Sequence, residues 1–251
     1  MEVLERLAIA PEGISVSELS RSLRIDKSVV SRILSSLAMQ GYVQKDASSD
    51  QYQLTFKISA MAYAHFGAVG FPERCLPILR ELAQQTGELV ELAVADCEQL
   101  WLVAKVEGWQ RVRVAAYSGG PVVLHAMASG KAWLATLPKA EALRIATARD
   151  LEPITPTTIT TPEALAAELE QVRRQGYAVS REELMEGATS VAVAVPSPVT
   201  RGTAVGSLVV VAPSFRMTDT VVAEIVPELQ ARARALSSVW PIAASSKGRE
   251  E

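Results

Sequence analysis

Apolar residues recur every three or four positions along residues 1–40, which is the spacing of helices that bury one face. Three short helices are expected in succession, over 1–10, 15–23 and 26–40. Ser15 is placed to cap the second helix, with Glu18 reaching back to its backbone amide, and Asp26 is placed to cap the third. The short turn between the second and third helices is typical of a helix-turn-helix.

A predicted hairpin follows the third helix. Gly41 ends that helix, and strands are expected at 42–45 and 51–54 with a polar turn between them. Three helices and a hairpin in this order are typical of a winged helix-turn-helix, whose third helix reads the major groove of DNA. An ordinary three-helix core would give similar apolar spacing. The capping pattern, the polar face of the third helix and the hairpin together favour DNA binding.

Charge supports DNA binding only through its placement. The whole chain has a formal net charge of −3, and residues 1–66 hold seven basic and seven acidic side chains. The basic residues gather near the turn, on the third helix and on the hairpin, away from the acidic first helix. The residues expected to contact DNA are Ser17, Arg24, Lys27, Ser28, Val29, Ser31, Arg32 and Lys45.

The remainder of the chain mixes strands with helices. A helix over 56–66 is followed by Gly67, Gly70 and Pro72, and a further helix begins near Glu73. The later pattern predicts strands at 89–94, 100–106, 111–116, 189–196 and 204–212, and helices at 126–137, 139–148, 162–175 and 218–239. The expected fold class is α+β, with an antiparallel sheet covered by helices. The expected segments are a winged helix-turn-helix domain over 1–56, a linker helix over 57–71, a second domain over 72–242 and a disordered tail over 243–251.

Composition agrees with two globular domains, since 49% of the residues are hydrophobic and 21% are charged. Cys75 and Cys97 do not form a pair with metal-ligand or redox spacing. The N-terminus lacks the basic start of a signal peptide, and no apolar run approaches the roughly 20 residues that cross a bilayer. We therefore expect a cytoplasmic protein with no metal, no cofactor and no membrane contact.

Two segments of the second domain resemble a known family. Residues 119–132, GGPVVLHAMASGKA, and residues 176–183, GYAVSREE, with Gly187 and Ala192, resemble the effector-domain signature of the isocitrate-lyase-regulator (IclR) family. The threonine-rich run 155–161 and the third-helix segment 25–32, IDKSVVSR, also resemble that family. The resemblance spans nearly the whole chain.

The resemblance implies a bacterial transcription regulator with a GAF-like effector domain. It implies a dimer or tetramer that binds a pseudo-palindromic operator in double-stranded DNA, with repression as the default mode. It also implies an effector pocket for a small organic acid, formed by the loop before the helix at 128–131, the segment 180–190 and the adjoining strand near 209–211. Carried over by position, the pocket residues are Met127, Ala128, Ser129, Gly130, Ser180, Ala188, Ser190, Val209 and Val211.

The chemistry of that pocket fits an acid, because backbone amides at the start of a helix can bind a carboxylate. Met127 and Ala188 make the pocket apolar, so we expect an effector with an apolar or aromatic body and a carboxylate head. Lys131 is expected to be solvated. His125 stands where a phosphate-binding loop would need its first glycine, so no such loop is expected.

Two other classes of function stay open on the residues alone. An enzyme finds little support, because Ser129 and Ser190 lie in no nucleophile elbow and only His65 and His125 are available as histidine bases. A ligand-binding or oligomerisation scaffold without DNA function would leave the polar groups around Ser129 without a purpose. Operator binding would separate a regulator from both.

Overall fold

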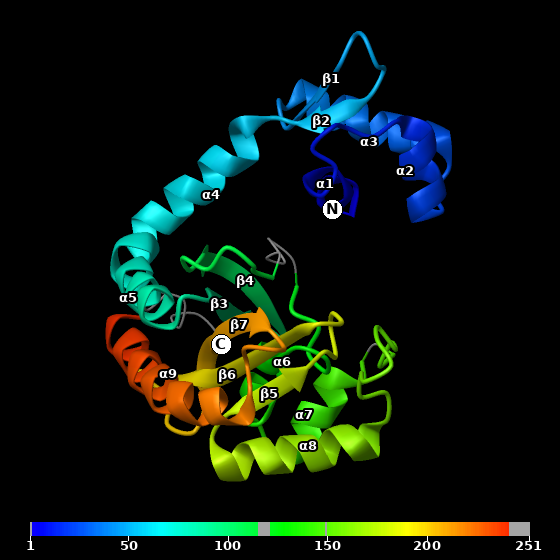
Figure 1. Ribbon diagram of the computed structural model, residues 1–251. Helices are drawn as coiled ribbons and strands as arrows, with labels where there is room; N and C mark the ends of the chain where they lie inside the picture. Colours follow the sequence, from blue (N-terminus) through cyan, green and yellow to red (C-terminus); the bar gives the residue numbers. More distant parts are fainter. Residues whose placement is uncertain (1, 115–120, 149, 241–251) are drawn as a thin grey trace, which may run out of the picture. The chain divides into compact units, whose positions relative to one another are not determined.

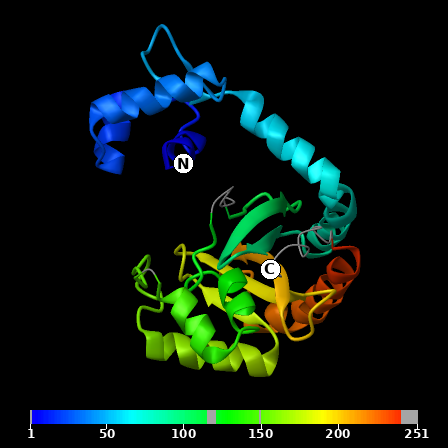
Figure 2. The same cartoon turned by 180° about the vertical axis from the view of Figure 1, so that it is seen from behind.

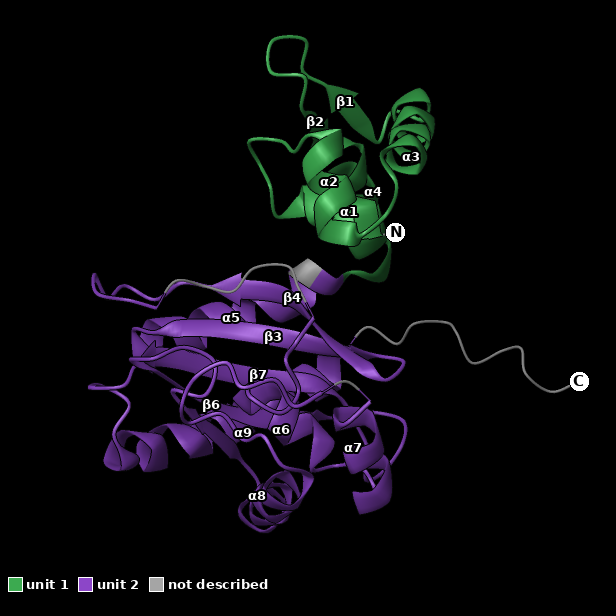
Figure 3. Ribbon diagram, turned by 90° about the vertical axis from the view of Figure 1, so that its right-hand side faces the viewer, with its two compact units in different colours: residues 1–70 green, residues 71–251 purple. Residues whose placement is uncertain are grey.

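The computed structural model describes residues 2–114, 121–148 and 150–240, and the predicted tail lies outside them. The chain divides into two compact units, Met1–Gly70 and Phe71–Glu251 (Figure 3). Each unit has its own apolar core. Among the described residues, no helix combines the length and the hydropathy that crossing a membrane requires.

Unit 1 has the predicted order of three helices and a hairpin, followed by a fourth helix (Figure 1). Its elements are α1 (Glu2–Ala8), α2 (Val16–Leu23), α3 (Lys27–Met39), β1 (Val43–Lys45), β2 (Tyr52–Leu54) and α4 (Phe56–Val69). The strands pair antiparallel. Val3, Leu7, Leu19, Val30 and Leu34 are buried where the three helices meet. These are the apolar positions that the helical spacing placed on the inner faces.

Both residues predicted to cap helices occupy N-cap positions, and the side-chain cap at Ser15 is confirmed. Glu18 N–H donates to Ser15 Oγ at 3.2 Å, and Ser15 N–H donates to Glu18 Oε2 at 2.9 Å, which completes the capping box. Asp26 is the N-cap residue of α3, as predicted, but its carboxylate makes no capping hydrogen bond. The amides of Val29 and Val30 instead donate to the backbone carbonyl of Asp26 at 2.9 and 3.0 Å, so its side chain is not needed.

Unit 2 is built on one antiparallel sheet of five strands in the order β4-β3-β7-β6-β5. Its strands are β3 (Leu89–Asp96), β4 (Gln99–Val106), β5 (Ala178–Arg181), β6 (Ala188–Pro196) and β7 (Ala204–Pro213). Its helices are α5 (Phe71–Thr86), α6 (Ala128–Leu134), α7 (Lys139–Ala146), α8 (Pro162–Gln175) and α9 (Asp219–Val239). The predicted α+β class with an antiparallel sheet is confirmed.

Two strand predictions for unit 2 need correction. The strand expected at 111–116 is absent from 111–114, and 115–116 lie outside the described residues. The carbonyl of Val112 accepts a hydrogen bond from Arg216 at 2.5 Å, so this stretch is held by a side chain rather than by a neighbouring strand. Strand β5 was not predicted, because its short run before a polar loop lacks the alternation of a longer strand.

Helices cover both faces of the sheet. Helices α5 and α9 lie on one face, and α6, α7 and α8 lie on the other (Figure 1, Figure 2). Directly paired positions on neighbouring strands share a face, so Glu91, Val209, Ala192 and Ala178 form one row across the sheet. The last three of these residues belong to the core under α6 and α8. Glu91 therefore faces the same interior layer.

Helix α6 begins against the chain that leads into it. A Cβ added at Gly130 would lie 2.4 Å from the carbonyl oxygen of Leu124 and 2.5 Å from its Cα. We expect Gly130→Ala to lower the free energy of unfolding by about 1 to 3 kcal/mol, as overpacking does in rigid cores. Thermal unfolding of the full chain measures this loss.

Gly67→Ala is the matched control, because a Cβ at that helical position meets nothing within 4 Å. Removing a glycine from a helix stabilises it by roughly 0.5 to 1 kcal/mol. Equal unfolding temperatures for the Gly130→Ala and Gly67→Ala variants would contradict the proposed contact with Leu124.

Candidate functional site

A cavity of about 360 Å³ lies in unit 2 between the sheet and the start of α6. Seven of the nine residues expected in a pocket line it: Met127, Ser129, Ser180, Ala188, Ser190, Val209 and Val211. Ala128 and Gly130 do not line it. Ala128 is fully buried in the core, and Gly130 packs on the backbone of Leu124. The structure thus brings together side chains from β5, β6, β7 and α6 that are up to 84 residues apart in sequence (Met127 to Val211).

Six lining residues were not among the named positions: Leu184, Met185 and Thr189, which fall in the segment 180–190 assigned to the pocket, and Leu89, Glu91 and Val114, which were missed. Leu89 and Glu91 reach the cavity because β3 pairs with β7, where Leu89 stands opposite Val211 and Glu91 opposite Val209. That register joins strands more than 100 residues apart and cannot be read locally. The available signal was Glu91 itself, a charged residue inside a run of apolar ones.

The hydroxyl groups of the cavity differ in their bonding. Ser180 Oγ donates to the carbonyl of Ala126 at 2.6 Å, which ties β5 to the chain before α6. Thr189 Oγ1 and Ser214 Oγ share a hydrogen bond of 3.0 Å. Ser129 is fully buried, and its Oγ has no partner among the described residues. A buried hydroxyl without a hydrogen-bond partner lowers the stability of the fold. A ligand that bonds to Ser129 would remove that cost.

Glu91 is the one ionisable side chain among the described residues that line the cavity. It is 3% exposed, and its Oε1 has no hydrogen-bond partner within the described part of the chain. Burial raises the pKa of Glu91 to about 7, and the positive charge of Lys105, which stands opposite it on β4, lowers that value in part. The cavity therefore combines apolar walls with one unsatisfied acid.

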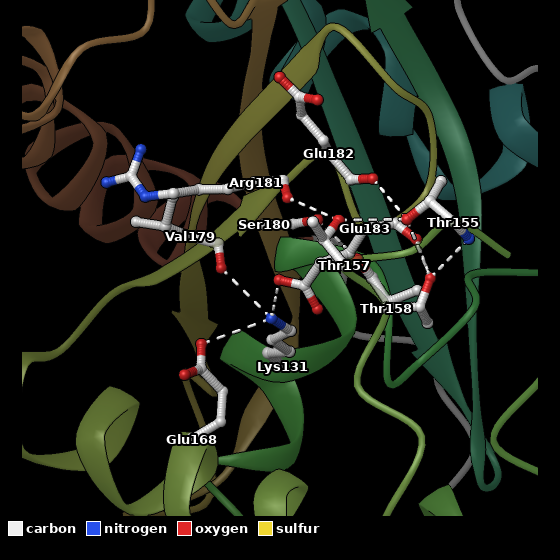
Figure 4. A network of polar contacts seen from close by, with 11 residues as sticks. Lys131, Thr155, Thr157, Thr158, Glu168, Val179, Ser180, Arg181, Glu182 and Glu183 are labelled. Carbon is white, nitrogen blue, oxygen red and sulfur yellow. Dashed lines mark hydrogen bonds and ion pairs between the residues drawn. The ribbon is translucent and has the colours of Figure 1, made fainter. Parts of the chain in front are cut away.

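The expectation that Lys131 is solvated is wrong. Its side chain is fully buried, and its Nζ contacts Glu183 Oε1 at 2.5 Å, Glu168 Oε1 at 3.4 Å and the carbonyl of Val179 at 3.3 Å (Figure 4). A buried ammonium persists only with such partners. They come from α8, from β5 and from the turn after β5, at least 37 residues later in the chain, so local sequence gives no sign of them.

A threonine-rich loop holds the same segment from the other side (Figure 4). The hydroxyls of Thr155, Thr157 and Thr158 donate to the carbonyls of Glu182, Arg181 and Glu183 at 2.7, 3.2 and 2.6 Å respectively. Leu184 and Met185, which line the cavity, follow directly. The loop and Lys131 therefore fix the chain that forms one cavity wall.

The residues expected to contact DNA lie in unit 1. Lys27, Ser28, Ser31 and Arg32 are exposed on α3, Val29 and Ser17 are half-buried on α3 and α2, and Arg24 is exposed in the turn. Lys45 on β1 pairs with Asp50 across the hairpin at 2.5 Å. Arg24 ends α2 with a φ of 56°, a left-handed conformation that turns the chain into α3. The exposed polar side chains thus gather on the first half of α3.

Comparisons with known proteins place both units in one family. The model of the IclR helix-turn-helix domain matches residues 1–47. The model of the bacterial transcriptional regulator IclR C-terminal domain matches residues 65–238. The repressor AllR of Escherichia coli is 29% identical over 217 residues, which cover 86% of this chain and 79% of AllR. Relatives carry the names of transcription regulators, in agreement with a function other than catalysis.

Solved structures agree with these matches. An IclR-type regulator from a Silicibacter species is 30% identical, covers 90% of this chain and 88% of its own, and has a TM-score of 0.78. An IclR homologue from Microbacterium hydrocarbonoxydans, solved in complex with 4-hydroxybenzoate, is 21% identical with a TM-score of 0.72 over 90% of this chain and 91% of its own.

We expect Lys131→Met to lower the free energy of unfolding by roughly 3 to 5 kcal/mol, because it leaves the carboxylate of Glu183 buried without its partner. Denaturant unfolding measures the loss. The double variant Lys131→Met, Glu183→Gln is expected to recover part of it, since the buried charge of Glu183 is removed and the remaining carboxylate of Glu168 is partly exposed. Lys139→Met, at an exposed position, is the control. A Lys131→Met variant as stable as this control would show that the buried ion pair is dispensable.

Proposed function

This chain belongs to the IclR family of bacterial DNA-binding transcription regulators, and from that premise we propose that it represses its target gene until an effector binds. The effector we propose is a small organic acid, held in the cavity between the sheet and α6 of unit 2. The cavity, with its orphaned Ser129 hydroxyl and apolar walls, is the observation that carries this proposal.

The proposed DNA contacts are Ser17, Arg24, Lys27, Ser28, Val29, Ser31, Arg32 and Lys45. Side chains on the first half of α3 suit the major groove, because short hydroxyls and an arginine fork can reach base edges. Lys45 on the hairpin can bind a phosphate of the DNA backbone if its ion pair with Asp50 breaks. Repression is proposed because AllR, a relative over most of the chain, is named a repressor.

The start of α4 is fastened to the end of α3 within unit 1. Thr55 Oγ1 donates to the carbonyl of Gly41 at 2.6 Å, and Lys57 Nζ donates to the carbonyl of Gln40 at 2.7 Å. The Lys57 ammonium also lies 4.4 Å from the centre of the Tyr42 ring. A movement of α4 is therefore transmitted directly to the helix that we propose reads DNA.

Helix α4 also supports the proposal that the protein acts as a homo-oligomer. None of its described side chains is buried, although the helix is mostly apolar, and Phe56, Met61 and Tyr63 are 88%, 52% and 78% exposed. Exposed apolar area of this kind usually marks a contact surface. Two copies joined there would present two α3 helices to a pseudo-palindromic operator. Dimer and tetramer are both compatible with this surface.

The proposed effector is an acid with an apolar or aromatic body. Met127, Leu184, Met185 and Val211 supply apolar walls. The Ser129 hydroxyl is the principal donor for a carboxylate, because α6 has only seven residues and adds a small dipole. The complex of a distant relative with 4-hydroxybenzoate agrees with this class of ligand. The effector releases DNA only if it binds one arrangement of the heads more tightly than the other.

DNA binding is tested with a duplex selected by the full-length protein from a random pool. Arg32→Ala is expected to weaken specific binding by about 1 to 3 kcal/mol, the range of a base contact, in a mobility-shift titration at fixed salt. Arg174→Ala, an exposed arginine on α8, is the control and should leave the affinity unchanged. An unaltered affinity and footprint for the Arg32 variant would remove that residue from the groove.

Effector binding is tested with a panel of benzoate, 4-hydroxybenzoate, hexanoate and pyruvate. We expect at least one aromatic or aliphatic acid to raise the unfolding temperature of the wild-type chain and to release the selected duplex. Ala188→Phe fills the cavity from β6, so it should abolish both effects and keep the affinity for DNA. Ala140→Phe, at an exposed site on α7, is the control. A full ligand response in the Ala188 variant would move the site to another cavity.

A further inference from the structure

We propose that Glu91 determines the effector class: its carboxylate accepts a hydrogen bond from a hydroxyl or amino group of the ligand. The effector is then an organic acid that carries such a donor in addition to its carboxylate. This inference rests on the proposed function, because it assigns a second polar contact within the same cavity.

The position of Glu91 in the sheet makes it a cavity group rather than a surface one. It stands in one row with Val209, Ala192 and Ala178, which are 2% exposed or less. Its direct neighbours along the sheet are Val209 on β7 and the exposed Lys105 on β4, and its own side chain lines the cavity. Within the described part of the chain its Oε1 has no hydrogen-bond partner, and a buried carboxylate oxygen without a partner is unfavourable.

Two of the cavity hydroxyls are already engaged, and Ser129 Oγ, which has no partner among the described residues, makes no bond with Glu91. Ser180 Oγ already donates to Ala126, and Thr189 Oγ1 bonds with Ser214. Lys105 stands opposite Glu91 on β4, but its side chain is exposed and it is not among the cavity residues. A donor carried by the ligand would therefore complete the bonding of Glu91, and hydrogen bonds to a charged group are among the stronger ones.

The same carboxylate also excludes ligands. A second carboxylate on the effector would meet Glu91 inside a small apolar cavity, where two like charges repel strongly. Burial already raises the pKa of Glu91 to about 7, so the added charge would require one of the two acids to take up a proton. Monoacids with a hydroxyl or amine are thus accepted, and dicarboxylic acids are rejected.

Calorimetric titration of the full-length protein at pH 7.5 tests this. The probes are benzoate with 3- and 4-hydroxybenzoate, 4-aminobenzoate and terephthalate, and hexanoate with 6-hydroxyhexanoate and 6-aminohexanoate. At least one donor-bearing acid is expected to bind about tenfold or more tightly than its parent, and terephthalate more weakly than benzoate. In the Glu91→Leu variant the donor-bearing acid and its parent acid should bind with about equal affinity, and the parent acid should still bind.

Glu91→Gln is the second variant, since its amide oxygen keeps an acceptor with little change of shape. It should retain part of the preference for a hydroxyl and lose the preference for the ammonium of 6-aminohexanoate. Glu98→Gln, an exposed carboxylate paired with Arg144, is the control and should behave as the wild type.

Three results would overturn the inference. If Glu91→Leu leaves the ratio of the two affinities unchanged, the ligand's donor contacts a group other than Glu91. If the wild type binds benzoate or terephthalate as tightly as the donor-bearing acids, the cavity does not select for the donor at all. In both cases the proposed function stands. If none of the acids binds, the organic-acid effector of the proposed function fails, and this inference fails with it.

Discussion

The buried ammonium of Lys131 is the constraint on which the ligand-sized space of unit 2 depends. It lies on α6, and its partners lie on α8, on β5 and in the turn after β5, so one charge joins these segments. Because an unpaired charge in that layer would be very costly, these elements have little freedom to separate. The threonine hydroxyls then fix the chain after β5, and the wall formed by Leu184 and Met185 follows from that position. The cavity is thus held open by polar contacts around it rather than by its own apolar walls.

Sequence periodicity was sufficient for elements that bury one face and end at clear signals. The three helices of unit 1, the capping box at Ser15 and helix α8, which begins at Pro162 and ends before Gly176, are of this kind. Cavity residues on α6 and β6 were identified through a family resemblance. The resemblance indicated which positions line the pocket but not which atoms they contact. Glu91 and the environment of Lys131 could not be predicted, because both depend on which distant strands and helices become neighbours. Long-range register is set by the complete core, so a local pattern cannot contain it.

Unit 1 shows how a weakly charged head can still present a basic face. Three of its seven acidic residues are used within the fold: Glu18 completes the cap of α2, Asp46 accepts hydrogen bonds from the turn of the hairpin, and Asp50 pairs with Lys45. The exposed start of α3 keeps Lys27 and Arg32. Local placement rather than net charge therefore determines where a polyanion would be attracted. Fastening α4 to the end of α3 adds a mechanical link to that face.

Glu91 illustrates a trade of stability for selectivity. Its folded pKa of about 7 lies above the ordinary value of 4.5, so the folded chain binds that proton more tightly than the unfolded chain. The contribution of Glu91 to the free energy of unfolding is fully present below about pH 4.5 and is lost as the pH rises towards 7. A pKa shift of this size corresponds to a loss of roughly 3 kcal/mol. A leucine would avoid this loss and suit the row formed by Val209 and Ala192. A ligand that donates a hydrogen bond to the carboxylate stabilises its charged form and recovers part of the same free energy on binding. The cost of burying the Glu91 carboxylate would therefore be reduced when such a ligand occupies the cavity.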